Sequence, residues 1–538
     1  MSIKPSSLLK LSVAGAVLLS VGACKAADKG QGALESQSLS ALNLSKNEAS
    51  IFSKYFETDP CEVDELESLG ALAGLGMGEN GTNGVSFDSR EVNNGQVVYS
   101  DLTLKEDGTD QVQFSAKTAV FHCPQIRDDA PNFDRLDLTE IFIKNEDEGV
   151  EFTAETLNIA NPTATAARSV IDSMIRPNSD IGSDVGFGAI SITGAKIKSD
   201  DVNGTLEALS WGESRDEDGK GTADLTVDDV NFIVPSQNGS QDMTLDFAGM
   251  SIRNLNMGIK KSSQPGISSS GMVDNILGSL NAFEKPYDEL VVENLTIDSE
   301  GFSVNVDGVE GKTTQKGDII TTRQNLKPIE INLKPALADM PEFQQNYELL
   351  KSLDMETIKM FGSSVSQLNS ADDSVSVSDG LFIIEDAFRL NFEYNAEGVS
   401  EMLRKLKTVE EFSNETEVLA AYDSLKLRNF RLTLEDNSIV DKGLTVATHM
   451  TGQSEQSLKL LLTGAVFFAA SQAQNEIQAE VYSETVEAFA KFVKNGGTFT
   501  IEANPPEPFA LAPLITNQGD DMDPESLGFS ASQENGAK

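Results

Sequence analysis

Residues 247–257 read FAGMSIRNLNM, in which an aromatic residue comes first and apolar residues follow at positions 4, 6, 9 and 11. Four other segments fit the same ungapped pattern, and two shorter segments fit it without the aromatic residue. The copies are irregularly spaced, with 40 residues from Phe247 to Tyr287 but 135 from Tyr287 to Tyr422, which excludes a strict solenoid. The four segments begin at Phe133, Phe187, Tyr287 and Tyr422, and the shorter two span 97–104 and 225–232.

The interval between apolar positions changes from two residues to three in the middle of each copy. A plain strand keeps one face buried only with a strict period of two. A step of three restores that face when one extra residue is accommodated, as a β-bulge does, and Asn, Asp and Gly tolerate the dihedrals of such a site. We therefore expect long antiparallel strands, bent in the middle, with one apolar face; a strand–tight turn–strand hairpin is the alternative. The predicted bulge positions are Asn254, Asn294, Asn429, Gly194, Asp101 and Asp229.

The repeated segments resemble the strands of AsmA-like bacterial envelope proteins. In that family, Φ-x-Φ-x-N-Φ-x-Φ segments build a long, bent antiparallel sheet with an apolar groove, and the resemblance implies a role in lipid transport or envelope assembly. It covers residues 85–333, with a further candidate region at 372–436. The chain departs from the family in its higher acidity and in its N-terminus, where a lipoprotein-like signal stands in place of the family's usual membrane helix. The C-terminal third resembles uncharacterised periplasmic proteins of Gram-negative bacteria.

The whole chain predicts an α+β fold, made mainly of long bent antiparallel sheet with bulged strands, packed by helices, and with a helical C-terminal third. Helical patterns over 341–369, 397–421 and 437–494 underlie the last expectation. The expected parts are a signal peptide at 1–23, a tether at 24–40, a β-rich domain with inserted short helices at 41–335, an α+β domain with a helical block at 336–515 and a disordered acidic tail at 516–538.

Composition limits the possible functions. The chain has 538 residues, with 41 Lys and Arg against 85 Asp and Glu, and a formal net charge of −44. That charge argues against nucleic acid as a partner and against binding an anionic membrane through a basic face. Only 3 Cys and 2 His are present, too few for a Cys/His zinc site or an iron–sulfur cluster. We expect no cofactor.

The N-terminus carries a targeting pattern. Lys4 and Lys10 form a basic region, a short apolar stretch follows, and the segment ends Val-Gly-Ala-Cys at Cys24. This pattern resembles the lipobox of bacterial lipoproteins, which implies that Cys24 is lipidated, becomes the first residue and anchors the protein in a membrane. Lys25 after the cysteine favours the outer membrane, by resemblance to enterobacterial sorting. The alternative is an ordinary secretory signal cleaved after Ala26 or Ala27.

The other two cysteines, Cys61 and Cys123, form an even pair in a chain expected to be exported. A disulfide between them is one interpretation, and two separate buried thiols are the other. His122 next to Cys123 suggests a nucleophile pair. Adjacent strand residues point to opposite faces, which argues against that chemistry.

The sequence shows none of the familiar catalytic motifs: G-x-S-x-G, the phosphate-binding G-x-x-x-x-G-K-[ST] and H-E-x-x-H are all missing. The acidic stretch 214–221 superficially resembles a calcium loop, but it lacks the closing Glu, and Asp218-Gly219 is typical of a hairpin turn. With 85 carboxylates, an acidic pair cannot by itself indicate a glycosidase.

We therefore expect an exported, lipid-anchored envelope protein with a non-enzymatic binding or scaffolding role, in lipid binding or envelope assembly. Its partners would be the membrane, through the lipid on Cys24, and lipids or envelope proteins. A Ca²⁺-dependent carbohydrate-binding protein or a carboxylate-based hydrolase at the cell surface is the alternative, which rests on the abundant acids and the predicted export.

Overall fold

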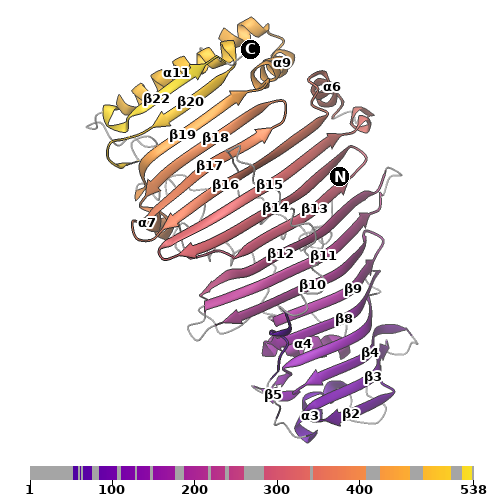
Figure 1. Ribbon diagram of the computed structural model, residues 1–538. Coiled ribbons are helices and arrows are strands. Elements are labelled where there is room, and N and C mark those ends of the chain that lie inside the picture. Colours follow the sequence, from indigo (N-terminus) through magenta and orange to yellow (C-terminus); the bar gives the residue numbers. More distant parts are fainter. Residues whose placement is uncertain are drawn as a thin grey trace, which may run out of the picture. The chain divides into compact units, whose positions relative to one another are not determined.

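The computed structural model describes most of the chain in fifteen stretches (Figure 1). It divides into two compact units, with Ser299 the last residue of unit 1 and Glu300 opening the main part of unit 2. The described residues are 52–58, 61, 65–75, 84–105, 111–127, 130–145, 149–175, 187–215, 220–236, 241–259, 284–339, 343–406, 424–460, 476–510 and 524–535.

Unit 1 is built on antiparallel strands. β1 and β2 both pair with β3, and from there β3, β4, β7, β8, β9, β10, β11, β12 and β13 each pair with the next, while β5 and β6 form a separate ribbon. The elements are α3 (Glu65–Ala71), η1 (Ala73–Leu75), β1 (Val85–Ser86), β2 (Ser89–Asn93), β3 (Gln96–Lys105), β4 (Val112–His122), β5 (Gln125–Arg127), β6 (Ala130–Asn132), β7 (Arg135–Asn145), β8 (Val150–Pro162), α4 (Ala164–Ile175), β9 (Phe187–Lys198), β10 (Asn203–Arg215), β11 (Lys220–Val234), β12 (Met243–Ile259) and β13 (Glu289–Asp298).

Unit 2 is also mainly antiparallel sheet. Its strands pair in the order β14, β15, β16, β17, β18, β19, β20, β22, and the short β21 pairs with β19. The elements are β14 (Phe302–Lys316), β15 (Ile319–Leu333), η2 (Pro335–Asp339), α6 (Gln344–Ser352), β16 (Thr357–Asn369), β17 (Ser374–Ile384), β18 (Phe388–Glu397), α7 (Val399–Leu406), β19 (Lys426–Asp436), α9 (Ile439–Thr451), α11 (Glu476–Asn495), β20 (Thr498–Ala503), β21 (Phe509–Ala510), η4 (Pro524–Leu527) and β22 (Phe529–Glu534).

The expectation of an α+β fold with a helical C-terminal third is wrong. Strands dominate both units, and the C-terminal third continues the sheet through β17 to β22, with α7, α9 and α11 beside it. Residues 357–369, for which a helix is predicted, form β16, because their β-branched and small residues pair with both β15 and β17.

The segment 516–538, for which composition predicts disorder, contributes η4 and the strand β22. Its alternating residues Phe529 and Ala531 face the core formed under α11, and β22 pairs with β20 along its whole length. A few apolar residues at a period of two are therefore enough to order part of an acidic, Gly-rich segment once a sheet edge is available. The signal peptide and the tether lie outside the described residues.

Left-handed residues mark the middle of alternate strands in unit 1. Their φ values are 53° at Asp101 in β3, 46° at Glu140 in β7, 59° at Gly194 in β9, 40° at Asp229 in β11 and 39° at Asn294 in β13. All five stand at the polar or small position of the repeated sequence pattern. L-residues rarely adopt this conformation, and Gly, Asn and Asp do so at the lowest cost.

These residues lie in one row across the strands. On β10, the residue opposite Gly194 is Glu207, because the ladder pairs on either side of it are Leu206 with Ala195 and Ala208 with Thr193. By the same argument Glu207 also lies opposite Asp229 of β11. We call this line, from Asp101 to Asn294, the bend row.

The bend row is not a row of one-sided bulges, which corrects the sequence-based expectation. The register between β3 and β4 is the same on both sides of it, as the pairs Ser100–Thr118 and Leu102–Ala116 show, so neither strand has an extra residue relative to the other. In both strands of a pair, the alternation of buried and exposed residues shifts by one residue at the bend row, which we call a change of phase. The strands also continue through the row, so the hairpin alternative is wrong.

Two predicted positions behave differently. Asn254, with φ 49°, belongs to a true bulge, because the pair Leu225–Ile252 is followed by Ala223–Leu255 and two residues therefore face Asp224. Asn429 is not left-handed, and it pairs directly with Asn395. The irregularity in β19 falls on its neighbour Arg428.

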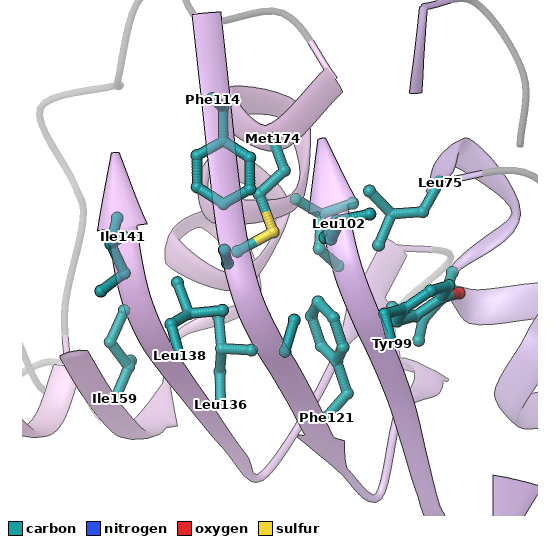
Figure 2. Close-up of a cluster of buried hydrophobic side chains, with 14 of the residues drawn as sticks. Leu75, Tyr99, Leu102, Phe114, Phe121, Leu136, Leu138, Ile141, Ile159 and Met174 are labelled. Carbon is teal, nitrogen blue, oxygen red and sulfur yellow. The ribbon is translucent and has the colours of Figure 1, made fainter. Parts of the chain in front are cut away.

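The change of phase keeps one face apolar along the whole strand. In β4 the buried residues are Phe114 and Ala116 before the row, then Ala119 and Phe121 after it. Together with residues of β3, β7, β8, η1 and α4 they form the main core of unit 1 (Figure 2).

Candidate functional site: two apolar cavities

A cavity of about 250 Å³, the unit-1 cavity, lies on the apolar face of β8 to β12. A line of paired residues forms its floor: Phe152 pairs with Ile197, Ile197 with Gly204, Gly204 with Phe232, and Phe232 with Leu245. Lys196 is the one charged residue of the lining. The cavity therefore suits hydrocarbon and offers little to a polar ligand.

Gly204 shapes this cavity. A Cβ atom at this position would lie 2.3 Å from the ring of Phe232, so the ring occupies the space that any other residue would fill. Because this position in the middle of the floor has no side chain, the Phe232 ring of β11 can extend over β10.

A second cavity, the unit-2 cavity, has a volume of about 550 Å³ and lies between the sheet and three helical elements of unit 2. Met402 of α7, Val481 of α11 and Leu527 of η4 contribute one side. The strand side of the lining comprises Val375, Tyr394, Ala396, Leu425, Leu427, Phe430, Ile501, Ala503 and Phe529.

The sequence pattern builds the strand wall of the unit-2 cavity. The copy that begins at Tyr422 places apolar residues at Leu425, Leu427 and Phe430, and all three line the cavity. The irregularity at Arg428 provides the step of three that keeps Leu427 and Phe430 on one face. The guanidinium of Arg428 instead binds Glu397 (2.8 Å) and Asp372 (3.1 Å).

Tyr394 supplies the hydroxyl group of this lining. Burial raises the pKa of its phenol above the ordinary value, so the group stays a hydrogen-bond donor at neutral pH. Its neighbours in the ladder are the apolar residues Val377 and Phe430, and the other lining residues of the cavity are apolar as well.

A buried carboxylate that sequence reasoning missed binds Lys54 and Tyr55, which lie among the first described residues of unit 1. Asp224 of β11 is 2% exposed, and its oxygens accept hydrogen bonds from the backbone N–H of Asn254 (2.8 Å), the hydroxyl of Tyr55 (2.9 Å) and the ammonium of Lys54 (3.2 Å). The ring of Tyr55 packs directly on Gly212, where a Cβ atom would lie only 2.1 Å from Cδ2 of the ring. The available clue was an acid placed between two apolar residues of β11, Ala223 and Leu225.

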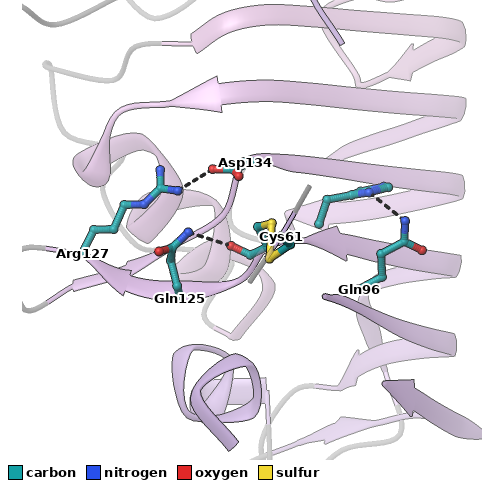
Figure 3. The surroundings of a disulfide bond; sticks show 7 residues. Cys61, Gln96, Gln125, Arg127 and Asp134 are labelled. Carbon is teal, nitrogen blue, oxygen red and sulfur yellow. Dashed lines mark hydrogen bonds and ion pairs between the residues drawn. A yellow bond between two sulfur atoms is a disulfide. The ribbon is translucent and has the colours of Figure 1, made fainter. Parts of the chain in front are cut away.

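Cys61 and Cys123 are joined by a disulfide, with their Cα atoms 5.6 Å apart (Figure 3). The bonded Cys123 has no free thiolate, so it cannot act as a nucleophile with His122. The His122 ring is held by Asp137 (2.8 Å) and Gln96 (3.2 Å). Cys24 lies outside the described residues.

No group of three or more His, Cys, Asp or Glu residues in the described part of the chain is placed to hold a metal ion. No helix among the described elements combines the length and apolar character needed to cross a membrane. The middle of the calcium-like stretch, 216–219, lies outside the described residues.

The polar face of the bend row carries carboxylates that are not equivalent. A hydrogen bond to Asp229, together with the charge of that residue, raises the pKa of Glu207 above 4.5. Asp101 instead binds Lys117 at 2.6 Å. At neutral pH the like charges of Glu207 and Asp229 oppose folding, whereas the opposite charges of Asp101 and Lys117 support it.

Asp229→Asn should therefore raise the melting temperature at pH 7, since Asn still tolerates the left-handed conformation and the repulsion is removed. A raised carboxyl pKa lowers stability as pH rises from 4.5 through the folded-state value, so the gain should vanish below about pH 4. Thermal unfolding of both proteins from pH 3 to 8 checks this. Asp101→Asn is the matched control and should lower the melting temperature at pH 7; a gain in both variants would contradict the assignment.

Comparison with known proteins adds little to this geometry. A family model described as "Uncharacterized protein" matches residues 381–534, a segment that contains β18 to β22 and all lining residues of the unit-2 cavity except Val375. No curated protein matches the chain.

Proposed function

We propose that this protein is a non-enzymatic component of the bacterial cell envelope that binds the hydrocarbon part of a lipid on the apolar face of unit 1. The unit-1 cavity is the observation that carries the proposal. Its floor is a continuous line of apolar residues from five strands, and the bend row keeps such a face along the full length of each strand. Burying hydrocarbon there is favourable by about 25 cal/mol per Å² of apolar surface.

The proposal includes export and a lipid anchor on Cys24, with the protein held at the outer membrane. Its support is the lipobox-like segment ending at Cys24 and the Cys61–Cys123 disulfide, a bond typical of oxidising compartments outside the cytoplasm. Several acyl chains on one residue would hold the protein stably on the membrane. The charge of −44 would keep the tethered protein soluble despite its apolar strand face.

The test uses a Cys24→Ser variant, which cannot be lipidated. Because this variant carries no acyl chain of its own, any lipid found with it is a bound ligand. We expect the wild type to remain with the membrane fraction and the variant to be released. The variant, purified without detergent, should carry lipid that organic extraction and mass spectrometry detect. Recovery of an apo protein that takes up no lipid from vesicles would leave only a scaffolding role.

Gly204→Leu on the Cys24→Ser background tests the site itself. The new side chain would displace the Phe232 ring and fill the cavity, so we expect at least a tenfold loss of bound lipid per protein. Ser214→Leu, at an exposed position of the same strand that does not line the cavity, is the control and should bind as the parent does. Equal lipid in all three proteins would place the binding site elsewhere.

A further inference from the structure

The lining of the unit-2 cavity excludes a charged ligand group. None of its twelve lining residues is charged, and its walls at Leu427, Ala503 and Leu527 are at most 7% exposed. A carboxylate or phosphate placed there would be buried without a partner. The net charge of −44 would disfavour an anion further.

The size and lining of the unit-2 cavity suit hydrocarbon rather than water. The volume of about 550 Å³ is within the range of small-molecule sites, and the lining is aliphatic and aromatic. Apolar side chains at Val481 and Leu527 oppose those at Phe430 and Ile501, so a ligand between them would contact hydrocarbon on both sides.

One polar group in this lining can fix the orientation of a ligand. The Tyr394 hydroxyl makes no hydrogen bond to any residue in the described part of the chain, and its phenol is protonated at neutral pH. A protonated hydroxyl in apolar surroundings gains most from a ligand oxygen that can accept its hydrogen bond.

We propose that the unit-2 cavity binds one uncharged hydrocarbon chain whose terminal oxygen accepts a hydrogen bond from the Tyr394 hydroxyl. Long-chain alcohols and long-chain aldehydes belong to this class, and free fatty acid anions do not. This site is separate from the unit-1 cavity, and the inference does not depend on the proposed function.

Three probes with the same chain test the site: dodecan-1-ol, dodecanoate and dodecane. Native mass spectrometry and thermal shift on the full-length Cys24→Ser protein should show binding of dodecan-1-ol at least tenfold tighter than that of dodecanoate. Tyr394→Phe should weaken the affinity for dodecan-1-ol by about 2- to 10-fold, because one hydrogen bond is lost. The affinity for dodecane should not change. Equal weakening of both probes would mean that Tyr394 only packs.

Cavity-filling variants locate the site. Ala503→Leu, or Val481→Phe if the first does not fold, should remove one bound dodecan-1-ol, whereas Gly204→Leu should leave that molecule in place. If unit 1 binds no lipid but Ala503→Leu still abolishes binding, the proposed function fails and this inference stands. If Ala503→Leu and Val481→Phe fold and bind dodecan-1-ol as the parent does, the inference is overturned.

Discussion

Truncating Phe121 to alanine is expected to destabilise unit 1 by about 3–5 kcal/mol. Phe121 is fully buried, and its ring makes edge-to-face contacts with Tyr99 at 6.1 Å and Phe133 at 5.7 Å between ring centroids. The variant loses the transfer free energy of a phenyl group and leaves a cavity between strands that share a rigid register. Phe121 lies in the half of β4 that follows the bend row. A large loss of stability would therefore show that this half of the strand belongs to the core.

Urea unfolding followed by tryptophan fluorescence measures this effect. Trp211 is the single tryptophan, it is 2% exposed and it lies in unit 1, so its emission reports on that unit. Leu66→Ala is the control, because Leu66 is 75% exposed on α3 and should cost less than about 1 kcal/mol. A Phe121→Ala protein with the unfolding midpoint of the wild type would rule out the proposed core.

Removing the disulfide is expected to cost about 4 kcal/mol in the chain-entropy account. Cys61 and Cys123 are 62 residues apart, and the bond encloses α3, η1 and the strands β1 to β4. Without it, the unfolded chain regains the freedom of a long loop, so the double variant Cys61→Ser/Cys123→Ser should unfold at much lower urea.

Chemical reduction distinguishes the effect of losing the disulfide bond from the effect of replacing the two cysteine side chains. Dithiothreitol should lower the unfolding midpoint of the wild type towards that of the double variant and should leave the double variant unchanged. Thiol titration of the unfolded, unreduced Cys24→Ser protein should find no free cysteine. Two titratable thiols, or a double variant as stable as the wild type, would contradict the structure at this point.

Much of the strand architecture could be predicted from local sequence. The step of three apolar positions identified Asp101, Gly194, Asp229 and Asn294 as unusual backbone positions, and all four are left-handed. This was possible because burial on one face of a strand depends on a period that a short segment displays by itself.

The errors arose where neighbouring strands decide the outcome. At Asn429 the pattern was right but the irregularity falls on Arg428, because the register with β18 places Asn429 opposite Asn395. Residues 357–369 have too few apolar residues to identify a strand, and they become one between β15 and β17. Asp224 was missed because its partners Tyr55 and Asn254 are 169 and 30 residues away.

The sequence by itself determined the phase of each strand, the places where that phase changes and the cysteines available for bonding, because these depend on residue type and on spacing within about ten residues. Only the tertiary structure decided that the left-handed residues align in one row, that Phe232 lies over Gly204 and that apolar side chains from five strands and three helical elements enclose a cavity around Tyr394. The physical reason is register: a shift of one residue between two strands leaves every local pattern intact but moves each side chain to the other face of the sheet.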